Sequence, residues 1–194
     1  MYSFFAAFFE ALKGIVTSYA TYIVDDAVAI FAQTDFADQD SRACWLLAMH
    51  VLAQTFEHDQ DEHWPQPAHF SSICPPLLAQ VPRVASSEDL YASLAHALTA
   101  LAKAADSPAH LKTINTALLA HLRDADARTR LVAVRLERAL TAKLGADWLV
   151  SLAEMLPRIG ELQDDEDEEV ETETARWIVD IEGVMGESLD SMLR

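Results

Sequence analysis

The sequence predicts an all-α protein in which antiparallel helix pairs stack into a solenoid of about nine helices. Apolar residues recur at helical spacing along most of the chain, and no segment alternates apolar and polar residues between the turn signals of a β-hairpin. Two segments also repeat at a fixed offset, which is typical of a repeat architecture. Of the 194 residues, 51% are hydrophobic and only five are Gly, which indicates a packed protein and excludes a disordered one.

The first two helices are expected over 2–13 and 16–34. The segment 2–13 is rich in Phe and apolar on all sides, so it suits a helix lodged between neighbours. Glu10 and Lys13 interrupt its apolar run well short of the ~20 residues that a membrane span needs. We therefore interpret this segment as a buried helix and not as an anchor or a signal peptide.

The third helix has a clear start and a clear apolar stripe. Asp38, Asp40 and Ser41 are candidate N-caps, because short polar side chains accept bonds from the free N–H groups of a first turn. The stripe follows the spacing i, i+4, i+7 and i+11 with Trp45, Met49, Leu52 and Phe56. After the polar loop EHDQDEHWPQP, further helices are expected over 68–81, 87–104, 108–122, 127–143, 147–162 and 168–184.

The repeat places these helices in pairs. The segment TALLAHLRDADARTRLVA (116–133) aligns with PRIGELQDDEDEEVETET (157–174), an offset of 41 residues that superposes one Asp-x-Asp turn on the other. Pro76 and Pro157 lie about twice that period apart, each in the first helix of a pair, where a proline kinks the helix. The period, the kinked helix and the turn resemble the HEAT repeat.

The pairing gives a domain organisation. We expect a single repeat domain over 1–194, cut from a longer solenoid. Residues 1–13 form a half-repeat of the preceding unit, and 161–194 form an acidic C-terminal capping pair.

Charge and cysteine content exclude several classes of protein. A formal net charge of −17 argues against a chain that coats nucleic acid or an anionic membrane as a whole. Cys44 and Cys74 lie in separate apolar stretches without the spacing of a metal site, so we expect buried, reduced thiols and no disulfide framework.

Residues 140–194 are similar to the extreme C-terminus of one family. The segments LPRIGELQDDEDEEVE and GESLDSML carry the densest similarity. It extends more loosely to the start of the chain through FFEALKG, LLAMHVLAQTF, PPLLAQV and DADARTRLVAV, and it fails in the loop EHDQDEHWPQPAHF. On these segments the chain resembles the large HEAT-repeat subunit of the small-subunit processome, the family of U-three small nucleolar RNA-associated protein ten and HEAT repeat-containing protein one.

The resemblance implies a scaffold of the nucleus and nucleolus. Such a protein belongs to the transcription-associated subcomplex, joins the ribosomal RNA precursor early, and supports the processing of small-subunit rRNA and, in some members, transcription by RNA polymerase I. The implied partners are processome subunits and the pre-ribosomal RNA particle, with direct RNA contact by this domain left open and no membrane or small-molecule substrate. Two alternatives stay open: a general HEAT-repeat scaffold in transport or signalling, and an all-α enzyme or metal hydrolase.

The acidic run ELQDDEDEEVETETARW has two interpretations. A calcium loop counted from Asp165 would need Gly at position six and Glu at position twelve, where the chain has Val170 and Arg176. The carboxylates precede an apolar stripe that includes Trp177, so they form either a solvated helix cap or an acidic docking surface for a basic partner. The candidate docking residues are Asp164, Asp165, Asp167, Glu168 and Glu171.

Basic residues concentrate in the segment HLRDADARTRLVAVRLERAL. Guanidinium groups on one flank of a helix that begins near 127 are suited to phosphates or carboxylates, although a solvated face or pairing within the chain is the favoured alternative. Two apolar residues near this flank, on the side away from the expected core, make it a mixed contact patch for a partner protein or RNA. The candidate patch comprises Arg123, Arg128, Leu131, Val134, Arg135 and Arg138.

The remaining motifs predict a non-catalytic domain without cofactor or metal. His58, His63 and His69 gather in the polar loop, but their spacing fits neither an HExxH helix nor a closed Cys/His zinc site. The sequence has no GxSxG nucleophile motif, no Gly-rich phosphate loop, and no paired carboxylates outside the acidic run.

Overall fold

A computed structural model describes residues 19–59, 62–189 and 192 of the chain, and these residues contain helices but no strand. This confirms the all-α prediction for the described residues. The helix expected over 2–13, the half-repeat assigned to 1–13 and the start of the helix expected over 16–34 lie outside them. The elements are α2 (Ala20–Gln33), α3 (Gln39–Glu57), α4 (Pro67–Leu78), the 3₁₀ helix η2 (Val81–Arg83), α5 (Glu88–Ala105), α6 (Pro108–His121), α7 (Ala127–Leu144), α8 (Ala146–Leu149), α9 (Leu152–Leu162) and α10 (Glu168–Met185).

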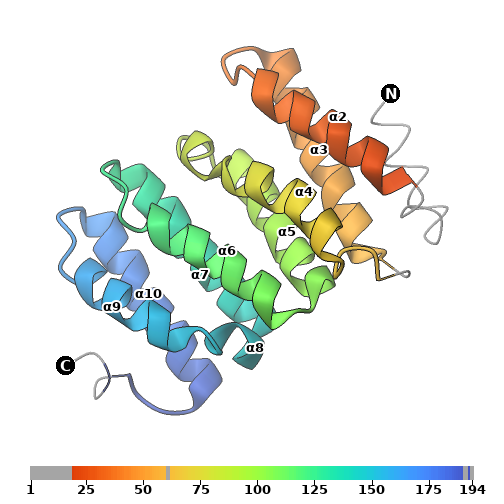
Figure 1. The fold of residues 1–194 in the computed structure, drawn as a ribbon. Helices are drawn as coiled ribbons and strands as arrows, with labels where there is room; N and C mark the ends of the chain where they lie inside the picture. Colours follow the sequence, from red (N-terminus) through yellow and green to blue (C-terminus); the bar gives the residue numbers. More distant parts are fainter. Residues whose placement is uncertain (1–18, 60–61, 190–191, 193–194) are drawn as a thin grey trace.

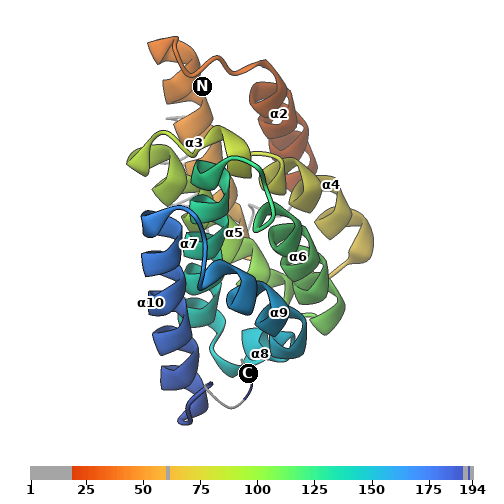
Figure 2. The ribbon, with the colours of Figure 1, turned by 90° about the vertical axis from the view of Figure 1, so that its left-hand side faces the viewer.

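The helices form two layers, as expected for a solenoid of helix pairs. One layer contains α2, α4, α6 and α9, and the other contains α3, α5, α7 and α10 (Figures 1 and 2). Within the second layer α3 packs on α5, α5 on α7, and α7 on α10, while α2 packs on α4 and α4 on α6 in the first. Each inner pair therefore buries one face against the pair before it and another against the pair after it.

The repeated turn has the same geometry in its two copies. The carboxylate of Asp124 accepts the N–H of Asp126 at 2.9 Å, and that of Asp165 accepts the N–H of Asp167 at 3.0 Å. Asp126 and Asp167 then cap α7 and α10 by accepting N–H groups of the first helical turn at 3.0 Å. These caps satisfy donors that a helix start leaves free. Asp38 caps α3 from the predicted position, accepting the N–H of Ser41 at 2.8 Å.

Two expectations about local structure need correction. The helix expected over 147–162 is broken into α8 and α9, because Trp148 turns inward and its indole N–H donates to Glu137 of α7 at 2.9 Å. Pro157 does lie inside a helix, but one that begins only at Leu152. Cys44 is exposed and not buried, whereas Cys74 is buried, and burial raises the pKa of its thiol to about 12.

All four tryptophans are fully buried, and each indole N–H has an acceptor. Trp45 of α3 donates to the side chain of Gln80 at 3.2 Å, and Trp177 of α10 donates to the hydroxyl of Thr141 on α7 at 3.2 Å. Trp64 donates to the backbone oxygen of Thr55 at 3.3 Å, so the loop that the sequence marks as polar contains a core anchor. Since a buried donor without an acceptor is costly, these bonds fix how neighbouring helices meet.

A buried carboxyl group lies among these contacts. Glu137 of α7 is fully buried, and only one of its two oxygens has a partner, the indole N–H of Trp148. Burial raises the pKa of Glu137 to about 8, against the smaller opposing effect of that hydrogen bond. The carboxyl therefore stays protonated in the folded protein at pH values where it is ionised in the unfolded chain.

Among the described residues no helix is both long and apolar enough to cross a membrane.

The Trp177 anchor can be tested by truncation. Trp177→Ala should lower the free energy of unfolding by about 3–5 kcal/mol, because it leaves a cavity and removes the bond to Thr141. The control Val179→Ala, at a position that is 64% exposed on the same helix, should change it by less than about 0.5 kcal/mol. Urea unfolding followed by circular dichroism measures both, and equal midpoints for the two variants would contradict the assignment.

The Glu137 carboxyl predicts a pH dependence. Unfolding releases its proton between the ordinary pKa of 4.5 and the folded value of about 8, so stability falls as pH rises through this window. The loss is about 1.4 kcal/mol per pH unit for one proton. Glu137→Gln keeps an acceptor for Trp148 but has no proton to release. Urea unfolding from pH 5 to 8 should show the wild type losing stability relative to this variant, and parallel pH curves would contradict the prediction.

Candidate interaction surface

The predicted basic patch is largely neutralised by ion pairs with neighbouring helices. Arg123 pairs with Glu161 at 3.0 Å, and Arg135 pairs with Glu88 of α5 at 2.6 Å while it stacks on the Tyr91 ring. Arg138 pairs with Glu173 and, at 2.7 Å, with Asp180, both on α10. These pairs favour the intramolecular alternative for most of the patch.

The six predicted patch residues do not form one surface. Arg128 is exposed and forms no ion pair within the described part of the chain. Val134, predicted to face outward, is fully buried, and Leu131 is partly buried against the core. The outward assignment of Val134 is wrong because α7 lies between α5 and α10 and so buries residues on both flanks.

Two of the five predicted acidic docking residues have structural roles. The Asp165 side chain is 7% exposed and pairs with Arg130 at 2.6 and 2.9 Å. Burial alone would raise the pKa of Asp165, but the hydrogen bonds from Arg130 and from the N–H of Asp167 hold it below its usual value. Asp167 caps α10. Asp164, Glu168 and Glu171 are exposed.

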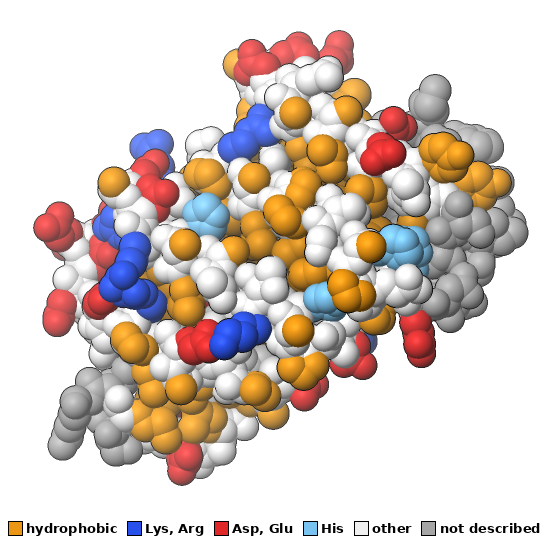
Figure 3. Space-filling view, viewed as in Figure 1, with side chains coloured by type: hydrophobic (Ala, Val, Ile, Leu, Met, Phe, Trp, Pro, Cys, Tyr) orange, Lys and Arg blue, Asp and Glu red, His pale blue; other side chains and the backbone are white. Residues whose placement is uncertain are grey.

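The pair between Arg130 and Asp165 joins consecutive helix pairs. Arg130 lies on α7 and also donates to the backbone oxygen of Asp124 at 2.9 Å, so one guanidinium binds the α6–α7 turn and the α9–α10 turn together. Figure 3 shows carboxylates gathered where the α2–α3 and α9–α10 turns lie in Figure 1, at the top and at the left edge of the view. The α2–α3 and α9–α10 turns are thus acidic (Figure 3), and the Arg130 contact holds the second of them against the α6–α7 turn.

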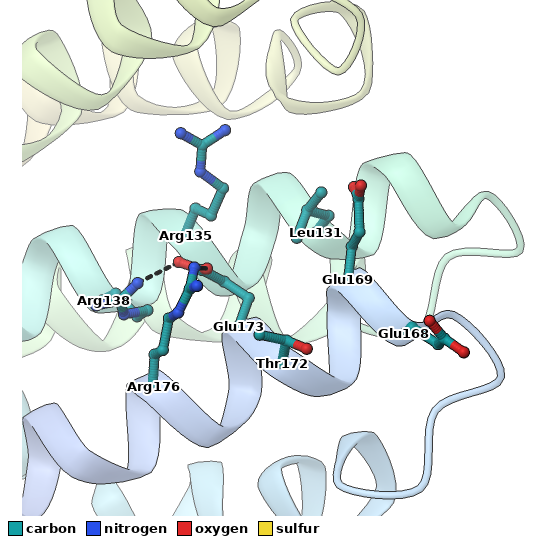
Figure 4. Close-up of a pocket in the computed structure, with 8 residues that line it drawn as sticks. All are labelled: Leu131, Arg135, Arg138, Glu168, Glu169, Thr172, Glu173 and Arg176. Atoms are coloured by element: carbon teal, nitrogen blue, oxygen red, sulfur yellow. Dashed lines mark hydrogen bonds and ion pairs between the residues drawn. The ribbon is translucent and has the colours of Figure 1, made fainter.

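A groove of about 600 Å³ lies between α7 and α10, in the second layer. It shares Leu131, Arg135, Arg138 and Glu168 with the predicted residues, and it adds residues of α10 that the sequence did not indicate. The lining consists of Leu131, Arg135, Arg138, Glu168, Glu169, Thr172, Glu173 and Arg176 (Figure 4). In this view Arg138 and Arg176 converge on Glu173, whereas Arg135 points away from α10 toward α5.

The groove, which we call the α7–α10 groove, changes character along its length. Glu168 and Glu169 are exposed at the start of α10, and neither forms an ion pair within the described residues. The middle is rich in guanidinium groups around the buried Glu173. Beyond it a second hollow of about 450 Å³ is lined partly by Ala175 and Val179, and Val179 is 64% exposed. Acidic, basic and apolar zones thus follow one another along one helix.

The sequence did not predict that the outer face of α10 borders a groove, because the sequence pattern of a helix shows only its own faces. Thr172, Arg176 and Val179 alternate with the core residues Thr174 and Trp177. This pattern indicates only the solvent-exposed face of a terminal helix. Their spacing i, i+4, i+7 was the available signal, but nothing local shows that this face borders α7.

The histidine loop is a packed structure. The rings of His63 and His69 stack with centroids 3.6 Å apart, and the Nδ1 atom of His69 lies 3.0 Å from the backbone oxygen of His63. Asp59 accepts the N–H groups of His63 and Trp64, each at 3.0 Å. Within the described residues no group of three or more His, Cys, Asp or Glu side chains is arranged to hold a metal ion.

Comparisons with known proteins match the whole chain. Residues 1–64 match the family model described as the BP28CT (NUC211) domain. Over 100% of its length the chain is 50% identical to a protein of Chaetomium globosum and 50% identical to one of Neurospora crassa, and it covers 11% of each. Over 99% of its length it is 42% identical to a protein of Aspergillus fumigatus, of which it covers 12%. All three relatives are named U3 small nucleolar RNA-associated protein 10, and the chain spans only about one ninth of their length.

The coupling free energy of the ion pair between Arg130 and Asp165 can be measured with a double-mutant cycle. Arg130→Ala should cost about 2–3 kcal/mol of unfolding free energy, since the hydrogen bonds to a mostly buried carboxylate are lost. The coupling between Arg130→Ala and Asp165→Ala should exceed about 1 kcal/mol. The exposed control pair Lys112 and Glu154 should couple by less than about 1 kcal/mol. Urea unfolding gives both values, and equal couplings would remove the special role of Arg130.

Proposed function

The chain belongs to the family of U3 small nucleolar RNA-associated protein 10, to whose C-terminal region it corresponds, and from this premise we propose that it is a non-catalytic assembly module of the small-subunit processome. The α7–α10 groove is the observation that carries the proposal, because it is an open surface built from two consecutive helix pairs. A solenoid presents such surfaces to partner chains and does not enclose a substrate.

The proposed setting comes from the names of the relatives. Association with the U3 small nucleolar RNA suits a nucleolar protein that supports the processing of pre-ribosomal RNA to small-subunit rRNA. Within that setting we assign the domain to the transcription-associated subcomplex, whose subunits are its expected partners, with a supporting role in transcription by RNA polymerase I. The net charge of −17 favours protein contacts over RNA contacts for this domain.

The partner segment is expected to match the three zones of the α7–α10 groove. A basic side chain suits Glu168 and Glu169, which are exposed and unpaired within the described residues. A carboxylate suits Arg176, which uses one nitrogen on Glu173 and is 62% exposed. An aliphatic side chain suits the hollow beside Val179. The exposed Asp164 and Glu171 extend the acidic zone as a docking surface for further basic residues.

The groove is tested by blocking it with charge in the full-length protein. Thr172→Arg with Val179→Arg places two long cations in the groove at exposed positions, so folding should be unaffected. We expect a several-fold loss of the protein from particles purified through another processome subunit, measured by quantitative mass spectrometry.

The matched control adds the same two charges to other helices. Thr113→Arg with Val150→Arg changes a residue of α6 and a residue that is 78% exposed beside α8. Normal incorporation of this control with loss of the groove variant supports the proposal. Normal incorporation of both variants would exclude the α7–α10 groove as the docking site.

A further inference from the structure

The turn between η2 and α5 carries an acidic serine motif. It reads Ser86, Ser87, Glu88 and Asp89, so carboxylates stand two and three positions after Ser86. Ser86 is exposed and lies outside any helix, while Glu88 and Asp89 are exposed in the first turn of α5. A kinase that selects substrates by charge needs such a segment: an accessible hydroxyl on non-helical backbone, followed by carboxylates.

No other serine or threonine of the described residues has carboxylates at both of these positions. Ser151 has a single carboxylate three positions on, and it is only half exposed. We propose that Ser86 is a phosphorylation site for an acidophilic serine kinase. The proposal does not rest on the proposed function.

The hydrogen bonds of the turn select Ser86 over Ser87. The Ser87 hydroxyl accepts a hydrogen bond from Arg42 of α3 at 2.9 Å and donates one to Asp89. The Ser86 hydroxyl has no such partner within the described residues. The free hydroxyl can therefore enter a kinase active site without breaking a bond in this protein.

The reaction is an ordinary phosphoryl transfer from ATP. The Ser86 oxygen attacks the γ-phosphorus, a new O–P bond forms, and the bond between the γ-phosphorus and the β-bridging oxygen breaks as ADP leaves. The hydroxyl proton goes to the general base of the kinase. The product adds a charge of about −1.5 to −2 and three acceptor oxygens to the turn.

The added phosphate lies near two ion pairs that join α5 to the neighbouring helices α3 and α7. Arg42 binds Asp89 at 2.5 Å on the side of α3, and Arg135 binds Glu88 at 2.6 Å on the side of α7. The Nε atom of Arg42 is shielded from solvent and has no acceptor among the described residues. Because both carboxylates are exposed, their pairs exchange at little cost, and phosphate competes for the same guanidinium groups.

This competition for guanidinium groups also affects the α7–α10 groove, because Arg135 belongs to both sites. Arg135 lines that groove and is held toward α5 by Glu88 and by the Tyr91 ring. A phosphate two residues before Glu88 repels that carboxylate and attracts the arginine. Phosphorylation of Ser86 therefore changes the charge along one wall of the groove.

The test uses the purified chain, magnesium ATP and a purified acidophilic serine kinase. Tandem mass spectrometry should find one phosphate on Ser86. Ser86→Ala should remove at least about nine-tenths of the incorporation, while Ser71→Ala, at another exposed serine that lacks following carboxylates, should leave it unchanged.

A second variant separates recognition from the acceptor. Glu88→Gln with Asp89→Asn keeps the Ser86 hydroxyl but removes both charges, and it should slow phosphorylation about tenfold or more while circular dichroism shows an unchanged helix content. Phosphate on Ser87 instead of Ser86, no phosphate on the chain while a control acidic peptide is modified, or an unchanged rate in the Gln/Asn variant would each overturn the proposal.

Discussion

The structure depends on lateral burial between consecutive helix pairs. A single amphipathic pair cannot bury its apolar faces alone, so each pair is stable only between neighbours. Here the requirement is met by polar bonds as well as by apolar contact. Trp45 and Trp177 are buried at different levels of the stack, and each donates to a residue contributed by a neighbouring element. Because those indole donors would be costly without acceptors, the bonds select one register of each helix on the next.

The same constraint determines where the charges go. Arginines project from the sides of α3 and α7, where a neighbouring pair packs, and they meet carboxylates there: Arg42 with Asp89, Arg135 with Glu88, and Arg138 with Glu173. The basic segment of the sequence is therefore used mainly to join pairs. What remains on the surface is an excess of carboxylates at the turns and the zoned α7–α10 groove, where the side chain of Arg176, the one arginine of α10, is 62% exposed.

These features support a proposed role in which the protein binds partner chains through its surface. The groove joins the last two helix pairs of the described residues, so a partner that binds it contacts α7 and α10 together. The turn at Ser86 lies one pair earlier, yet it is connected to the groove through Glu88 and Arg135. Docking at the groove and modification at Ser86 would thus both act on Arg135, whose ion pair with Glu88 rearranges at little cost because the Glu88 side chain is 72% exposed.

The sequence by itself determined the helical class, the pairing of helices, the Asp-x-Asp turns and the cap at Asp38, because periodicity and capping are local properties of the chain. It also carried the family resemblance. Only the tertiary structure decided that Val134 is buried, that Cys44 is exposed, that the helix expected over 147–162 breaks after Leu149, and that α10 shares a groove with α7. Each of these depends on which element packs across from a residue. That neighbour is often distant in the sequence, as Glu173 is from Arg138.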